Sequence, residues 1–272
     1  MKMYLISDNI DTQTGMRLAG VDGVVVHERE ELRTALETAL AEQVKSERLK
    51  ADLITNVSHD IKTPLTSIIN YVDLIKRQHI EDPTVQKYLE VLDQKSQRLK
   101  TLTEDLVEAS RASSGNIKLE ITNIDFVELV QQTTGEFEEK YAIRHLEIVN
   151  TLPNEVIMIE ADGRRLWRVL ENLYNNAFKY ALEGTRVYVT IEDHGADVVF
   201  TIKNVSANPL NISPDELTER FVRGDVSRTT EGSGLGLSIA KNLTNLMGGE
   251  FKIQTDGDLF IAKIQFEILN NL

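Results

Sequence analysis

A histidine followed by an aspartate, His59-Asp60, is the residue pair in this sequence whose types most directly suggest chemistry. Apolar residues recur around the pair at steps of three and four, which predicts one buried face of a helix. This face comprises Ile54, Val57, Ile61, Leu65, Ile68, Val72 and Ile75. His59 falls outside it, so its imidazole is expected to point to solvent as a nucleophile that Asp60 can orient and deprotonate. Most exposed histidines have no such role, so this interpretation requires a phosphoryl donor elsewhere in the chain.

Two more residues belong to the same helical stretch. Thr63 lies four residues after His59, and therefore shares its polar face one helical turn away. Pro64 has no N–H to donate to the carbonyl of Asp60, so a bend is predicted just after His59. A helix that flexes here would reorient the histidine.

A second polar helix face lies between residues 172 and 180. Asn172, Asn176 and Lys179 share one side of this helix, and Tyr180 follows directly. Amide oxygens are suitable ligands for Mg²⁺, and a lysine can meet a phosphate as a point charge. Taken alone, the pattern is better explained as a solvated helix face.

Three alternate glycines, Gly232, Gly234 and Gly236, open a further helix. Glycine lets the backbone approach a phosphate closely, and the N–H groups at a helix start bind anions. The spacing differs from that of dinucleotide-binding folds, and a polar loop rather than a strand precedes it. A P-loop lysine is also absent, so the run by itself is weak evidence for a phosphate site.

The residues around His59 belong to a helical pattern that runs without a breaker from about Glu30 to Lys76. A break at 79–83 separates it from a second helix that begins near Thr84. The apolar face of this second helix comprises Val85, Leu89, Leu92, Ser96, Leu99, Leu102, Leu106 and Ala109. Two helices with a short connection form an antiparallel hairpin, which we assign to residues 42–113. Because two apolar faces cannot enclose a deep core, a homodimeric four-helix bundle is predicted.

Residues 117–272 alternate between strand and helix patterns, which predicts an α/β sandwich. Strands are expected at 118–121, 146–149, 156–160, 186–192, 198–203, 250–255 and 260–267. Helices are expected at 125–141, 163–180 and 235–246, with a polar irregular stretch over 204–232. The whole chain is thus predicted to be an α+β multidomain protein: a small α/β piece, a helical hairpin and a sandwich.

Residues 1–41 predict the small α/β module. The apolar stretches 3–6 and 24–26 are expected to be strands, with a short helix between them. Two strands bury too little surface to be stable alone, so the module is expected to pair with its copy or pack elsewhere. The segments 4–8, 14–20 and 21–24 resemble the N-terminal part of the small F-type subunit of V/A-type ATPases, which suggests a fold and no activity. A natural module and an engineered fusion both account for it.

Composition excludes several classes of function. The net charge of −13 argues against nucleic-acid binding. The absence of cysteine excludes disulfides and thiolate chemistry and suits the reducing cytoplasm. The five histidines show no metal-ligand spacing, and no apolar run has the length of a membrane span.

Together, these stretches resemble the sensor histidine kinases of two-component systems over about residues 45–270. Residues 58–65 are similar to the phosphoacceptor box, and 172–180 to the N box. Residues 219–225 are similar to the F box, and 232–236 to the second glycine box. The resemblance implies a cytoplasmic kinase, or the cytosolic part of a membrane-anchored one.

The resemblance implies roles for the helical hairpin. His59 would attack the γ-phosphate of ATP and become phosphohistidine, with Asp60 as the adjacent acid/base group. The phosphoryl group would pass to an aspartate of a response regulator receiver domain. Thr63 occupies the position of the family's phosphatase threonine or asparagine, where it would place a water against the regulator's phospho-aspartate.

The resemblance also implies how ATP and Mg²⁺ would be held. Asn176 would be the main Mg²⁺ ligand, assisted by Asn172. Lys179 and Tyr180 would contact phosphates or ribose, and Arg223 would stabilise charge on the transferring phosphoryl group. The glycines 232, 234 and 236 would let a lid close on the phosphates.

One position departs from the family pattern. The first glycine box normally places an aspartate at the end of a strand, where it accepts a hydrogen bond from the adenine amino group. Asn204 stands there in this sequence, and the glycines that should follow are absent. An amide oxygen accepts the same bond without the charge, a difference of about 1 kcal/mol. ATP binding is therefore expected to be retained and weaker.

Three functions fit these observations. The first is a histidine kinase that also dephosphorylates its regulator. The second is a degenerate dimeric scaffold that binds ATP and the regulator without phosphotransfer. The third is an ATPase of the same superfamily, but hydrolysing relatives carry a glutamate four residues before the Mg²⁺ asparagine, where this chain has Asn172.

Overall fold

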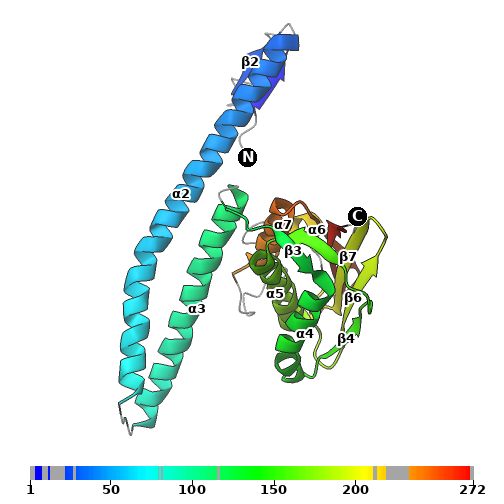
Figure 1. The fold of residues 1–272 in the computed structure, drawn as a ribbon. Helices are drawn as coiled ribbons and strands as arrows, with labels where there is room; N and C mark the ends of the chain where they lie inside the picture. The colour runs from blue at the N-terminus through cyan, green and yellow to red at the C-terminus, as the bar shows by residue number, and fades with distance from the viewer. Residues whose placement is uncertain are drawn as a thin grey trace. The chain divides into compact units, whose positions relative to one another are not determined.

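The computed structural model describes residues 4–7, 12, 22–26, 29–78, 80, 82–114, 117–210, 213–218 and 233–269 (Figure 1). The chain divides into two compact units, Met1–Ile54 and Thr55–Leu272. In the part of the chain that the structure describes, no helix has both the length and the apolar character needed to cross a membrane.

The first unit contains two short strands and the start of a long helix. Strand β1 (Tyr4–Ser7) pairs in parallel with β2 (Asp22–Val25), from Tyr4 opposite Asp22 to Ser7 opposite Val25. Both strands were expected from the sequence. Apart from Thr12, the helix predicted between them lies outside the described residues.

Helix α2 (Arg29–Lys76) is 48 residues long and continues through Pro64, as the unbroken pattern predicts. Helix α3 (Pro83–Ser113) follows after a short connection. The Asp82 side chain accepts hydrogen bonds from the N–H groups of Thr84 and Val85, so this carboxylate caps the start of α3. The predicted helix break is thereby confirmed, whereas the bend at Pro64 stays a prediction.

The apolar faces of the hairpin are only partly covered within one chain. On α2, Leu65 and Val72 are buried, whereas Val57, Ile61 and Ile68 are exposed. On α3, the large apolar side chains of Val85, Leu92 and Leu99 are likewise exposed. Contiguous apolar surface of this kind favours a protein partner.

The sandwich contains a five-stranded sheet in the order β4-β6-β7-β9-β8. The bounds of its strands are β4 Glu147–Thr151, β6 Arg186–Asp193, β7 Asp197–Val205, β8 Glu250–Asp256 and β9 Leu259–Glu267. Three helices accompany the sheet: α4 Phe126–Ala142, α5 Gly163–Tyr180 and α7 Gly236–Leu246 (Figure 1). A four-residue helix, α6 (Pro214–Leu217), lies within the stretch expected to be irregular.

A separate two-stranded pair, β3 (Thr122–Asp125) with β5 (Met158–Ala161), corrects one prediction. The strand expected at 118–121 is wrong, because pairing begins only at Thr122 opposite Ala161. The backbone N–H of Glu120 instead donates to the Asp162 carboxylate at 3.0 Å, which ties this segment to the start of α5 rather than to a strand.

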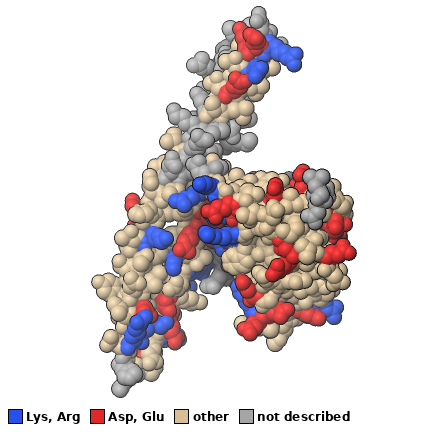
Figure 2. Space-filling model, viewed as in Figure 1, with Lys and Arg blue, Asp and Glu red and all other residues tan. Residues whose placement is uncertain are grey.

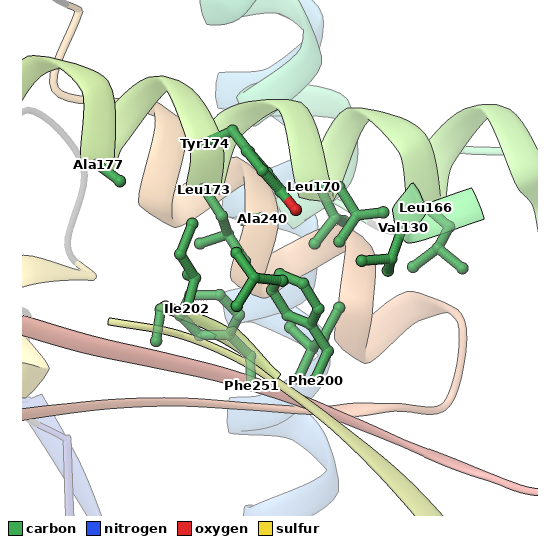
Figure 3. Close-up of a cluster of buried hydrophobic side chains, with 14 of the residues drawn as sticks. Val130, Leu166, Leu170, Leu173, Tyr174, Ala177, Phe200, Ile202, Ala240 and Phe251 are labelled. Carbon is green, nitrogen blue, oxygen red and sulfur yellow. The ribbon is translucent and has the colours of Figure 1, made fainter. Parts of the chain in front are cut away.

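The core of the sandwich lies between its helices and its sheet. Leu170, Leu173 and Tyr174 of α5 face Phe200 and Ile202 of β7, and all five side chains are almost completely buried (Figure 3). The outer surface is different, because acidic side chains are spread over the visible face of the sandwich (Figure 2), consistent with the net charge of −13.

Candidate functional site

Helix α5 is amphipathic, and its two faces have separate tasks. Asp162 caps its start by accepting from the N–H of Arg165 at 3.1 Å. The apolar face enters the core, so the opposite polar face, with Asn172, Asn176 and Lys179, remains available for a ligand.

This polar face borders a cavity of about 280 Å³. The cavity brings together residues from α5, the end of β7 and the start of α7. The predicted site residues that line it are Asn172, Asn176, Lys179, Tyr180, Asn204, Gly234 and Gly236. The remaining predicted residues of this site, Arg223 and Gly232, lie outside the described residues, together with the whole F-box segment 219–225.

The orientation of Asn172 is fixed by a hydrogen bond. Its amide nitrogen donates to the carbonyl of Arg168 at 2.9 Å, which leaves its Oδ1 as the acceptor on the cavity side. A Cβ added at Gly236 would lie 3.1 Å from this oxygen, closer than ordinary contact. The glycine therefore lets the α7 backbone approach the amide, and Gly234 adopts a positive φ of 70° just before it.

Asn204 offers a buried acceptor to the cavity. The residue is 2% exposed, and its Nδ2 donates to the Val205 carbonyl at 3.3 Å. Its Oδ1 has no hydrogen-bond partner within the chain. A buried unpaired oxygen costs about 1–3 kcal/mol, so a ligand that donates a hydrogen bond here recovers this energy. An amino group such as that of adenine fits this requirement.

The C-terminal end of α5 is held from two sides. The Arg144 guanidinium donates to the carbonyls of Phe178, Lys179 and Ala181, the last two at 3.0 Å. From the other side, the N–H of Ala207 donates to the carbonyl of Tyr180 at 2.8 Å. These bonds fix the helix end that carries Lys179 and Tyr180 relative to the loop that follows Asn204.

His59 lies on α2, away from the residues that line this cavity. Its side chain is 80% exposed, as predicted. Its Nδ1 is 3.7 Å from the nearest carboxylate oxygen of Asp60, which is longer than a hydrogen bond. Thr63 is exposed on the same helix. The structure thus keeps the candidate nucleophile accessible and does not bring it to the nucleotide cavity.

A charged cluster joins α3 to α5 and to the segment before α7. Arg168 donates to Asp105 at 2.6 Å and to Glu108 at 2.9 Å. Arg165 donates to the same Glu108 at 3.1 Å. Ser233, beside the glycine run, donates to Asp105 at 2.9 Å. The carboxylate of Asp105 therefore lies at the edge of the cavity.

Burial decides the ionisation of this cluster. Burial raises the pKa of the Asp105 carboxyl and prevails over the hydrogen bond from Ser233 and the charge of Arg168. For Arg168, burial acts to lower the pKa, but the hydrogen bonds from this guanidinium to Glu171 and Glu108 outweigh it, and the pKa is raised. The arginine therefore stays charged, and Asp105 is the member that protonates most readily.

Asp105, Arg168 and Arg144 were not predicted from the sequence. A signal for Asp105 exists, because it lies three residues after Leu102 and four before Ala109, on the apolar face of α3. A carboxylate on such a face requires a partner. No comparable signal marks Arg144, whose acceptors are 34 or more residues away.

Three family models match the chain. Residues 49–115 match the His Kinase A (phospho-acceptor) domain. Residues 161–268 match the histidine kinase-, DNA gyrase B-, and HSP90-like ATPase family. Residues 3–63 match the ATP synthase (F/14-kDa) subunit, which agrees with the resemblance of the N-terminal segments.

Characterised relatives include two sensor proteins. The chain is 27% identical over 216 residues to the sensor histidine kinase WalK of Bacillus subtilis, covering 78% of this chain and 35% of WalK. It is 29% identical over 248 residues to the sensor protein VanS of Enterococcus faecium, covering 89% of this chain and 63% of VanS. The chain thus spans less than two thirds of the length of these relatives.

Solved structures share the fold. Full-length ShkA in complex with AMPPNP superposes with a TM-score of 0.69 at 23% identity, over 81% of this chain and 46% of ShkA. Histidine kinase ThkA in complex with the response regulator protein TrrA superposes with a TM-score of 0.58 at 26% identity, over 85% of this chain and 66% of that chain.

A phospho-acceptor helical hairpin followed by an ATPase-type α/β sandwich defines a class of two-component signalling proteins. The chain belongs to the sensor histidine kinases.

Proposed function

We propose that this chain is an ATP-dependent protein-histidine kinase that phosphorylates His59. One observation carries the proposal: the cavity gathers two amide side chains, a lysine, an unpaired buried acceptor and a glycine-opened helix start. These are the groups that a purine, its phosphates and a hard cation require. In the reaction, a ring nitrogen of His59 forms a bond to the γ-phosphorus, the bond from that phosphorus to the β–γ bridging oxygen breaks, and ADP leaves.

Within the cavity, each group has a separate task. The free Oδ1 of Asn204 accepts from the adenine amino group, and Lys179 and Tyr180 contact phosphate or ribose oxygens. The amide oxygens of Asn172 and Asn176 hold Mg²⁺. When bound, this ion neutralises charge on the phosphates. The N–H groups at the start of α7 add donors for the phosphates.

The proposed kinase acts as a homodimer. The uncovered apolar side chains on both helices of the hairpin, among them Val57, Ile61, Leu92 and Leu99, support this because a second hairpin can bury them. Burial of such side chains contributes roughly 1.5–3 kcal/mol each when complete, so separating the subunits would expose several at once.

The proposed acceptor of the phosphoryl group is an aspartate of a receiver domain. The complex of the related ThkA with a response regulator protein supports this class of partner. The exposure of His59 supports it too, because the phosphohistidine must be reached by a second protein. We extend the proposal to Thr63, which would position a water for removal of phosphate from the receiver domain. Comparing Thr63→Ala with Thr66→Ala tests this, because only the first should lose dephosphorylation of a phosphorylated receiver.

The kinase proposal is tested by incubating the chain with γ-labelled ATP and Mg²⁺. Label that is lost in acid and stable in alkali is expected on the wild-type chain. His59→Gln should abolish the label while binding nucleotide as tightly as wild type. Asn176→Ala should lose both nucleotide affinity and label.

Two other results would assign a different function. Nucleotide binding without any label indicates the phosphotransfer-inactive scaffold. Release of free phosphate with no protein-bound label indicates an ATPase. The exposed His145→Gln variant is the matched control, and its labelling should equal that of wild type.

A further inference from the structure

We infer that Asn204 makes the nucleotide cavity accept keto purines, so that GTP binds alongside ATP. This inference rests on the proposed nucleotide site and adds the range of bases that it admits. It is carried by one buried amide, 2% exposed, whose oxygen lines the cavity without a partner.

An amide and a carboxylate offer different hydrogen-bonding groups to a base. An ionised carboxylate only accepts hydrogen bonds, whereas an amide presents an oxygen acceptor and an NH₂ donor. A half-turn of the side-chain amide exchanges the two. Adenine carries a donor amino group at C6, and guanine carries an acceptor oxygen there. With the base in one position, the amide matches both purines, whereas a carboxylate matches adenine and repels the guanine oxygen.

The surroundings of Asn204 show how little opposes this turn. Its Nδ2 donates only to the neighbouring Val205 carbonyl, at 3.3 Å, near the long limit of a hydrogen bond. Turning the amide gives up this long bond and places its oxygen near the same carbonyl. ATP should therefore remain the preferred nucleotide, by a modest margin.

The neighbouring lining residues add little discrimination. Phe260, opposite Asn204 in the β7–β9 register, is apolar and largely buried. Leu210 and Leu237 also line the cavity with apolar surface. The hydroxyl of Ser206 accepts from the N–H of Asn208 at 3.3 Å and, like any hydroxyl, can also donate. Asn204 is therefore the residue in this part of the wall that decides between amino and keto purines.

The expected effect is a small preference in the wild type and a large one after a single change. The dissociation constants of GTP and ATP should differ by about tenfold or less. Asn204→Asp should raise this ratio by roughly 10- to 100-fold, because an unmatched buried carboxylate and keto oxygen cost about 1–3 kcal/mol. Asn150→Asp, an exposed change of the same charge in the same sheet, should leave the ratio unchanged.

The test is calorimetric titration of the full chain with Mg-ATP, Mg-GTP and Mg-ITP. ITP has the keto group of GTP without its 2-amino group, so tight ITP binding supports the inference even if GTP is excluded by size. Wild-type binding of both GTP and ITP more than 1000-fold weaker than ATP overturns it, well beyond the roughly 5- to 150-fold that one unmatched hydrogen bond explains. A ratio unchanged in Asn204→Asp overturns it as well.

The wild-type comparison needs no variant, so misfolding of Asn204→Asp cannot hide the answer. Asn204→Ala gives an independent check, because it removes donor and acceptor together and should weaken ATP and ITP alike. Failure of ATP itself to bind would refute the nucleotide site and the inference with it. ATP binding combined with strict exclusion of keto purines would refute only the inference.

Discussion

Replacing Arg144 with methionine should destabilise the sandwich far more than a surface arginine change does. The guanidinium donates to three carbonyls at the end of α5, where the helix dipole also favours a positive charge. Methionine retains much of the apolar packing against Phe178 but cannot donate a hydrogen bond. The affected end of α5 carries Lys179 and Tyr180, so nucleotide affinity should fall together with stability.

The magnitude follows from the partners. The bonds to Phe178 and Ala181 are partly buried, whereas the bond to Lys179 is exposed and can be replaced by water. A hydrogen bond to a charged group contributes about 1.5–3 kcal/mol, and partial exposure reduces this. Two such bonds and a helix-end contribution of about 0.3–1 kcal/mol give an expected loss of about 3 kcal/mol.

Urea unfolding followed by tryptophan fluorescence measures this loss, because the single tryptophan, Trp167, lies on α5. The matched control is Arg186→Met, whose ion pair with Glu147 has side chains 61% and 67% exposed. That pair should contribute at most about 1 kcal/mol. If Arg144→Met and the control lose the same stability, the proposed fastening of α5 is wrong.

Two further predictions concern glycines and tyrosines. Gly249→Ala should cost about 2 kcal/mol, because its Cβ would lie 2.7 Å from the backbone oxygen of Gln265, whereas Gly135→Ala, with nothing within 4 Å in the middle of α4, should gain about 0.5–1 kcal/mol. Equal stabilities of the two variants in urea would contradict this contrast. Burial raises the pKa of Tyr174 to about 12, so the unfolded chain loses this proton first and the stabilisation, intact below pH 10, should fall by about 2–3 kcal/mol between pH 10 and 12. Tyr174→Phe should flatten this alkaline decline in the free energy of unfolding, and an unchanged slope would assign the decline elsewhere.

Local patterns predicted the helices well. The long α2, the break before α3 and the amphipathic α5 each follow from uninterrupted periodicity and from a capping aspartate, Asp82 or Asp162. Most strands of the sandwich were also predicted, because alternating apolar residues and turn residues define them locally. The strand expected at 118–121 was wrong because its apolar pattern is outweighed by a long-range bond from Glu120 to Asp162.

The site was predictable in its residue types and less so in its support. Periodicity placed Asn172, Asn176 and Lys179 on one face, and the structure brings that face to a cavity with Asn204. The roles of these residues stay predictions. The charged cluster around Arg168 depends on contacts between segments about 60 residues apart, which no local pattern encodes. Arg223 and Gly232 lie outside the described residues.

The most direct test of the central claim is to locate the phosphoryl group on the chain by mass spectrometry. Wild-type protein is incubated with Mg-ATP and digested at alkaline pH, which preserves phosphohistidine. The sequence holds five histidines, so the result discriminates among real alternatives. Phosphate is expected on His59 and on none of the other four. Phosphate on a different residue, or an unmodified His59 in protein that binds ATP, would contradict the proposed kinase reaction.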